Sequence, residues 1–198
     1  MSQLVVFVRH GESISNVRNI LSDHKDKYSL TRSGVSQAKK TAKELLKLKF
    51  DAIFSSPVLR ARQTAAIISN EVSLDVTLDK RLWERHQYNF NESDPHGGLY
   101  KFIPGARFES TKSVFERTKD FIDSRNEHSF IAVAHKVQQE CIAQEIYGFD
   151  DITGFPFKPA YASMTIVEKT SRKMKIIASG FPELPDSVMN RIPQKFRA

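Results

Sequence analysis

Two histidines and two arginines of this chain stand where buried segments end, a place where α/β proteins commonly hold their ligands. Arg9 and His10 follow directly on the apolar run that opens the chain, and His135 follows a second such run. Arg60 lies just after a third run, in the first turn of an expected helix. A guanidinium beside the free N–H groups of a helix start binds negatively charged oxygens. These residue types therefore predict a site for a small anion.

The apolar runs predict short strands that are buried on both faces. The first run should end before Arg9, because burying a charge is costly, and Gly11 then permits a turn that few other residues could make. Any one of these residues also fits an ordinary strand-to-loop transition. In a parallel sheet, however, the carboxyl ends of the strands share one edge, so distant residues can share a pocket. The expected strands are residues 4–8, 51–56, 74–78, 129–134, 163–168 and 174–178.

Segments with helical periodicity alternate with these strands. Ser56 and Pro57 signal a helix start, with the serine as cap and the proline in the first turn. The expected helices are residues 35–48, 58–69, 110–123 and 137–147, with a further helix beginning in 13–20. The second of these is expected to bury Leu59, Ala66 and Ile67. This alternation predicts a three-layer α/β/α sandwich with a largely parallel central sheet.

The length of 198 residues predicts a single domain, residues 1–198, with a core of ordinary size. A polar, turn-rich stretch at about residues 87–109 is interpreted as a surface insertion. Residues 181–198 form a basic, proline-containing tail. We consider two hypotheses for this tail: an arm that closes over an anionic substrate, or a frayed terminus.

Composition excludes several classes of protein. No apolar run is long enough to cross a membrane, and the first residues lack the pattern of a secretory signal, so a cytoplasmic location is the default expectation. The single Cys141 excludes a disulfide framework and a cysteine-rich zinc site. The net charge of +7 suits a small phosphate ester. Nucleic acid is a weaker alternative, because the basic residues are spread along the chain.

Five blocks of sequence, taken in order, carry a resemblance to a known family. They are Arg9-His10-Gly11-Glu12 with Asn16, Leu30-Thr31-x-x-Gly34-x-x-Gln37-Ala38, Ser55-Ser56-Pro57-x-x-Arg60-Ala61-x-Gln63-Thr64-Ala65, Glu84 after Leu82, and Val133-Ala134-His135. Together they resemble the histidine phosphatase superfamily, which includes the cofactor-dependent phosphoglycerate mutases. The resemblance implies a phosphoglycerate mutase-like fold.

The resemblance also implies catalytic roles. His10 would attack phosphorus and form a phosphohistidine, which requires a neutral imidazole. Arg9, Arg60 and His135 would bind the non-bridging phosphoryl oxygens. Glu84 would protonate the leaving oxygen and later accept a proton from the incoming nucleophile. No metal is expected, because the cationic side chains would do its electrostatic work.

Four further residues are expected to contact the substrate: Asn16, Gly11, Arg85 and Lys136. Lys136 is a departure, since the family usually has glycine after its second histidine. The lysine side chain would either crowd the phosphate or contribute one more cation. Two interpretations of the site therefore stay open, a defective site and a specialised one. The run Glu84-Arg85-His86 resembles the mutase branch, in which the arginine helps to hold the substrate, but the match fades at Gln87.

The first expectation for function is phosphomonoester hydrolysis of a small phosphorylated metabolite through a phosphohistidine on His10. The alternatives are a phosphoglycerate mutase, for which 2,3-bisphosphoglycerate would be the primer, and a non-catalytic phosphate-binding domain of the same fold. Otherwise no cofactor is expected. Neither nucleic acid nor membrane is an expected partner, and a homodimer remains open.

Overall fold

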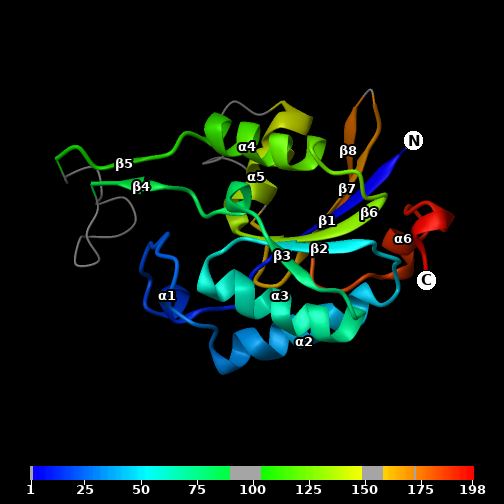
Figure 1. The fold of residues 1–198 in the computed structure, drawn as a ribbon, viewed down its shortest axis with the longest axis horizontal. Helices are drawn as coiled ribbons and strands as arrows, with labels where there is room; N and C mark the ends of the chain where they lie inside the picture. The colour runs from blue at the N-terminus through cyan, green and yellow to red at the C-terminus, as the bar shows by residue number, and fades with distance from the viewer. Residues whose placement is uncertain (1, 90–103, 149–157, 172) are drawn as a thin grey trace.

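The computed structural model describes residues 2–89, 104–148, 158–171 and 173–198. Its centre is a six-stranded sheet in the order β3-β2-β6-β1-β7-β8 (Figure 1). The strands of this sheet are β1 (Gln3–Arg9), β2 (Ala52–Ser55), β3 (Val76–Leu78), β6 (Ser129–Ala134), β7 (Met164–Lys169) and β8 (Met174–Phe181). The helices are α1 (Ile14–Val17), α2 (Arg32–Leu45), α3 (Leu59–Val72), α4 (Thr111–Asp123), α5 (Lys136–Tyr147) and α6 (Asp186–Met189), with the short turns η1 (Lys80–Leu82) and η3 (Gln194–Phe196).

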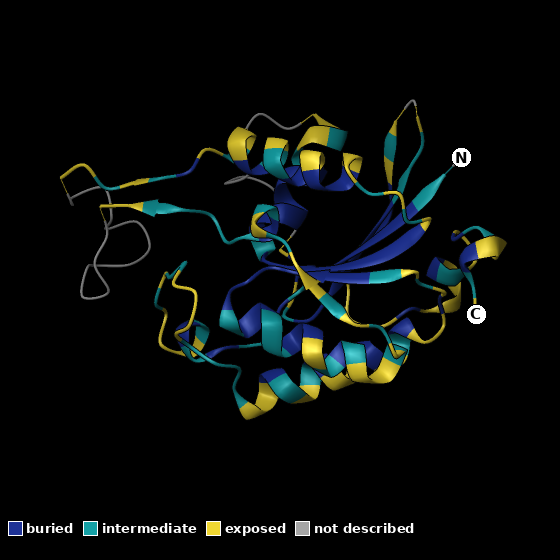
Figure 2. Ribbon diagram, in the orientation of Figure 1, coloured by how far each residue is buried: buried dark blue, intermediate teal, exposed yellow. Residues whose placement is uncertain are grey.

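Helices cover both faces of the sheet, which confirms the α/β/α sandwich. Helices α2 and α3 lie on one face and α4 and α5 on the other (Figure 1). Strand β1 serves both cores, since its side chains alternate between the two faces. Leu4, Val6 and Val8 pack in the core with α2 and α3, and Val5 and Phe7 in the core with α4 and α5. Figure 2 shows these strands buried between helices whose outer faces are exposed.

Strands β1, β2, β3 and β6 are parallel, as predicted. Strand β1 pairs with β6, β6 with β2, and β2 with β3. The last two strands differ, because β7 is antiparallel to β1 and β8 is antiparallel to β7. The carboxyl ends of β1, β2 and β6 therefore meet at one edge. Pairing continues past the strands, since His10 N–H donates to Ala134 O at 3.0 Å and Ser56 N–H donates to Val133 O at 2.9 Å.

The buried face of α3 is rotated from the face that we expected. Leu59 and Ile67 are only partly buried and Ala66 is exposed. The buried positions are Arg60, Ala61, Thr64, Ala65 and Ile68. Polar contacts account for the rotation, because Arg60 must reach the sheet edge and the Thr64 hydroxyl accepts a hydrogen bond from Gly11 N–H at 3.1 Å. Such contacts outweigh the apolar periodicity on which the prediction rested.

Gly11 is required by close packing rather than by an unusual turn. Among the described glycines, only Gly105, Gly148 and Gly180 have positive φ. A Cβ on Gly11 would lie 2.4 Å from Gly34 O, and a Cβ on Gly34 would lie 2.0 Å from Glu12 O. Backbone atoms cannot move aside as a flexible side chain can. The loop after β1 therefore rests directly on the first turn of α2.

The expected insertion is described only at its two ends, because residues 90–103 lie outside the described residues. The described ends pair as a separate antiparallel ribbon of β4 (Gln87–Tyr88) and β5 (Arg107–Phe108). This ribbon extends away from the sheet (Figure 1). In the described part of the chain, no helix is long and apolar enough to cross a membrane.

Both hypotheses for the tail are wrong, because residues 181–198 pack against the body of the protein. Leu184, Val188, Ile192 and Phe196 are buried in the core that also contains Leu45. The backbone is paired as well: Lys49 N–H donates to Phe196 O, and Ala198 N–H donates to Lys47 O. These contacts lie before the start of β2, at the sheet edge opposite to His10. The tail is therefore a structural element, neither a lid nor a frayed end.

The docked tail predicts a stability effect. Replacing the buried Phe196 by alanine should lower the free energy of unfolding by about 3–5 kcal/mol, because it leaves a cavity at the end of the core. Urea unfolding followed by circular dichroism measures this change. Gln194→Ala, at an exposed position two residues away, is the control and should change it by less than about 0.5 kcal/mol. Equal stabilities of the two variants would contradict the docked tail.

Candidate active site

His10 lies at the carboxyl end of β1 and is 2% exposed. Two neighbouring groups set the tautomer of its imidazole. Its Nδ1 is 2.7 Å from Gly11 O, a carbonyl that can only accept, so Nδ1 carries the proton. On the other side, Arg60 Nε donates to His10 Nε2 at 3.1 Å. Nε2 therefore carries the lone pair and accepts from Arg60 in the free site, and this neutral tautomer is the form that a nucleophilic imidazole requires.

Arg60 is buried at the start of α3, and its guanidinium connects the groups of the site. Besides His10, its Nη2 donates to Ser22 O at 2.9 Å and to Glu84 Oε2 at 3.1 Å. Its Nη1 is buried and has no hydrogen-bond partner among the described residues. The same holds for Arg9 Nε, although Arg9 Nη1 donates to Pro159 O at 2.6 Å. Both arginines line the cavity, so their guanidinium groups are placed to bind an anion there.

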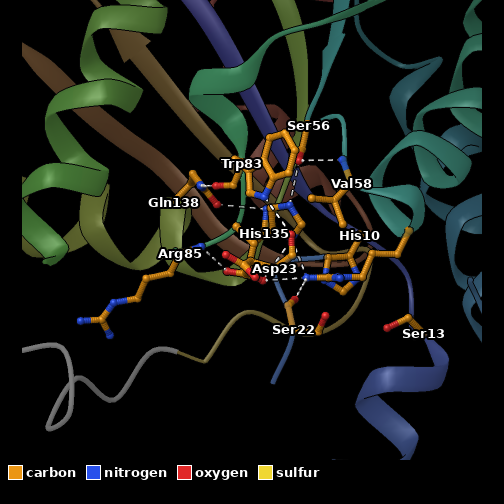
Figure 3. A network of polar contacts seen from close by, with 12 residues as sticks. His10, Ser13, Ser22, Asp23, Ser56, Val58, Trp83, Arg85, His135 and Gln138 are labelled. Carbon is orange, nitrogen blue, oxygen red and sulfur yellow. Dashed lines mark hydrogen bonds and ion pairs between the residues drawn. The ribbon is translucent and has the colours of Figure 1, made fainter. Parts of the chain in front are cut away.

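His135 and Glu84 form the second half of the cluster. His135 Nδ1 lies 3.1 Å from Glu84 Oε2, and its ring is 5.2 Å from the His10 ring between centroids. Ser56 Oγ lies 2.9 Å from His135 Nε2, so this hydroxyl orients the imidazole from behind (Figure 3). Ser56 does not cap α3, whose first residue is preceded by Val58. The five residues predicted as catalytic are thus brought together.

Burial and charge together shift the ionisation of the cluster. Burial, Arg60, His135 and Arg9 hold the pKa of His10 well below its ordinary value, because each disfavours the imidazolium. Burial also lowers the pKa of His135, and Glu84 opposes that shift. Burial alone would raise the pKa of Glu84, but His135 and Arg60 outweigh it and hold this pKa well below its ordinary value. In the free site, Glu84 is ionised and His10 is neutral.

A cavity of about 400 Å³ opens onto His10. This volume suits a small metabolite. Arginine and lysine side chains dominate its charge, and apolar side chains form part of its wall. The lining residues are Arg9, His10, Ser15, Asn16, Ile20, Leu21, Ser22, Arg60, Glu84, Arg85, Gln87, Phe108, Lys136, Val137, Glu140 and Lys158.

Three of the four residues that were expected to contact the substrate line the cavity. Asn16, Arg85 and Lys136 line the cavity, whereas Gly11 does not, and its N–H is already bonded to Thr64. The Arg85 side chain points away from His10 and His135 in Figure 3. Its Nε donates to Glu109 O at 2.5 Å, and its guanidinium lies over the Phe108 ring.

Glu140 and Phe108 also line the cavity, and neither was predicted as a site residue from the sequence. Glu140 lies one helical turn after Lys136, and its Oε1 is 2.9 Å from Lys136 Nζ. That i,i+4 spacing was visible in the sequence and could have identified it. Phe108 reaches the cavity from β5, and no local signal in the sequence marks it. Only the pairing of β4 with β5 brings it there.

The cluster offers one set of donors that a metal ion could use. His10, Glu84 and His135 have ligand atoms within 4.8 Å of one another. Two imidazoles and one carboxylate are a donor set that zinc accepts. Arg60, however, donates to His10 Nε2 and to Glu84 Oε2, so a metal would have to displace a buried cation from its own ligands. These residues fit a site that uses Arg60 as its cation.

A model of the histidine phosphatase superfamily (branch 1) matches residues 5–180. The chain belongs to this superfamily. It is 43% identical over 82 residues to a 2,3-bisphosphoglycerate-dependent phosphoglycerate mutase of Thermoplasma acidophilum, 41% of either chain. It is 39% identical over 105 residues to a 2-carboxy-D-arabinitol-1-phosphatase of Triticum aestivum, 53% of this chain and 21% of that one. The matches thus span less than half the length of these two enzymes.

Solved structures confirm the phosphoglycerate mutase-like fold. Bacillus stearothermophilus YhfR superimposes with a TM-score of 0.78 at 21% identity, covering 90% of this chain and 97% of that one. A phosphoglycerate mutase from Bacillus anthracis superimposes with a TM-score of 0.74 at 16% identity, covering 96% of both chains. At such identities the likeness to these two solved structures shows the fold alone.

The depressed pKa of His10 predicts its behaviour in a titration. As the pH is lowered from about 7.5 to about 6, the His10 ring should stay neutral, because protonation begins only below the ordinary value of about 6.5. Histidine-labelled protein followed by NMR measures this, with the resonance assigned from its loss in His10→Ala. The urea-unfolded chain is the control and should titrate near about 6.5. A midpoint at or above that value in the folded protein would contradict the assignment.

Proposed function

We propose that the protein hydrolyses a phosphomonoester of a small metabolite through a phosphohistidine on His10. The observation that carries this proposal is the neutral tautomer of His10 at the wall of the cavity, whose Nε2 carries the lone pair and accepts from Arg60 Nε at 3.1 Å. A neutral imidazole beside two guanidinium groups suits attack on phosphorus. The superfamily membership supports this chemistry.

In the first step, Arg60 Nε releases His10 Nε2, and the Nε2–phosphorus bond forms as the bond to the leaving oxygen breaks. The charge that spreads over the non-bridging oxygens is stabilised by the guanidinium groups of Arg9 and Arg60, which line the cavity. His10 becomes positively charged once it is phosphorylated. Gly11 O, 2.7 Å from Nδ1, accepts the hydrogen bond of that charged ring.

Glu84 is ionised in the free site, so it must gain a proton before it can act as an acid. A bound phosphate raises the pKa of Glu84, because it adds negative charge nearby and competes for Arg60. A monoanionic ester brings the proton, which Glu84 then passes to the leaving oxygen. In the second step, water gives a proton to Glu84, its oxygen attacks phosphorus, and the bond to Nε2 breaks.

A phosphoglycerate mutase primed by 2,3-bisphosphoglycerate is the second candidate, because the Thermoplasma relative carries that name. A mutase must hold the substrate carboxylate while it excludes water. Arg85 is the residue that the resemblance to the mutase branch expects to hold the substrate, but its Nε donates to Glu109 O and its guanidinium lies over Phe108. Hydrolysis is therefore the proposal that we favour.

The first test is trapping of the phosphoenzyme. Wild-type protein incubated with a labelled phosphate ester should retain acid-labile, base-stable phosphate, and His10→Ala should retain none and lose about a thousandfold or more in turnover. His128→Ala is the matched control, because His128 is exposed at the opposite end of the sheet. Label that persists in His10→Ala would overturn the proposal.

A panel of phosphate esters, run with and without 2,3-bisphosphoglycerate, separates the two candidates. If the protein is a phosphatase, phosphate release from several esters should exceed interconversion of 3- and 2-phosphoglycerate. Interconversion that needs 2,3-bisphosphoglycerate and that exceeds phosphate release would instead establish the mutase.

Glu84 depends on Arg117 of α4 for its position. Arg117 Nη2 donates to Glu84 O at 3.2 Å, and Nη1 donates to Arg81 O at 2.6 Å. The arginine is held in turn by Glu109, a nearly buried carboxylate that accepts from Nε and Nη2, each at 2.9 Å. The Arg117 guanidinium thus connects two backbone carbonyls, Arg81 O and Glu84 O, to helix α4. Arg117 is a positioning residue.

This geometry predicts a leaving-group effect. Arg117→Lys cannot bind both carbonyls and Glu109 together, so Glu84 should shift and kcat for an alkyl phosphate should fall about tenfold. For p-nitrophenyl phosphate, whose leaving group needs no acid, kcat should fall less than about twofold. Lys112→Met, at an exposed position of α4, is the control. Equal losses on both substrates would show a general structural role and contradict the prediction.

A further inference from the structure

Helix α5 places an ion pair in the wall of the cavity. Lys136 Nζ lies 2.9 Å from Glu140 Oε1, and both side chains line the cavity. The Lys136 side chain is 41% exposed, whereas the Glu140 side chain is only 9% exposed. A buried carboxylate in the wall of a phosphate site is unexpected, because its negative charge repels an anionic ligand. Such a group can serve to discriminate against the wrong substrate.

Glu140 changes what Lys136 can offer to a substrate. A lysine that is already paired with a carboxylate attracts a second anion weakly, since the pair has no net charge. The pair still provides N–H donors and carboxylate acceptors side by side. Burial raises the pKa of Glu140, and Lys136 and Arg9 oppose that shift. The pair therefore favours a neutral group that both donates and accepts hydrogen bonds.

Part of the remaining wall of the cavity is apolar, and Arg85 and Lys158 also line it. Val137 lies between the two residues of the pair in sequence, and Ile20 and Phe108 also line the cavity. Arg9 and Arg60 carry the unpaired buried N–H groups, which suit the phosphoryl group. The Arg85 guanidinium lies over the Phe108 ring.

From this arrangement we infer that Lys136 and Glu140 form a specificity subsite for a hydroxylated substrate, a polyol or sugar phosphate, and act against substrates with a second anionic group. This inference rests on the proposed phosphatase function. A hydroxyl would accept from Lys136 Nζ and donate to Glu140, whereas a carboxylate in the same place would face the Glu140 carboxylate.

Glycerol 3-phosphate and 3-phosphoglycerate are matched probes, since they differ by a CH2OH group in place of a carboxylate. The measured quantity is the ratio of their kcat/KM values for phosphate release. Wild-type protein should prefer glycerol 3-phosphate by about tenfold or more, and Glu140→Gln should reduce this preference by about tenfold, because it removes the like charge and keeps the shape. Glu140→Ala is a second variant, with the fold of each verified by thermal melting.

Glu145→Gln makes the same change at an exposed position of the same helix and should leave the ratio at the wild-type value. An unchanged ratio in both Glu140 variants, or a wild-type preference for 3-phosphoglycerate, would overturn the subsite. If wild-type protein releases phosphate from no ester and forms no phosphohistidine, the proposed function itself has failed. Turnover with an unchanged ratio rejects the subsite alone, so the two failures are distinguishable.

Discussion

The buried guanidinium of Arg60 is the interaction on which the rest of the site depends. It donates to His10, to Glu84 and to Ser22 O, so it joins the strand edge, the η1 loop and the loop after α1. A cation buried in this way requires compensating partners, and removing it would leave the partly buried Glu84 beside His135 without its second counter-charge. The rotation of α3, which leaves Leu59 and Ile67 only partly buried, follows from this requirement.

Tight backbone packing holds the nucleophile beside that cation. Gly11 and Gly34 leave no room for a Cβ, so the loop after β1 lies directly on α2. Thr64 on α3 receives the Gly11 N–H, and the Gly11 carbonyl faces His10 Nδ1. One short loop is thereby fixed by two helices, and it sets the tautomer of His10. Preorganisation of this kind removes reorganisation from the reaction itself.

Several features of the fold and the site were predictable from local sequence. The apolar runs before His10 and His135 predicted two parallel strands, and parallel strands bring their carboxyl ends together for topological reasons. The Ser-Pro start placed Arg60 at the same edge. Glu84 had no such local signal and was identified only through its match to a family block. Ser56 was recognised, but with the wrong role, because a helix cap and an imidazole partner have the same local sequence.

The sequence by itself determined the sandwich, the largely parallel sheet and the edge where His10, Arg60 and His135 meet. Periodicity and polarity are local properties, so they can be read along the chain. Only the tertiary structure decided that the basic tail packs on the far edge, that Arg85 turns towards Phe108, and that Glu140 neutralises Lys136 within the cavity. Each of these depends on distances between side chains and on competition between partners, which the order of residues does not contain.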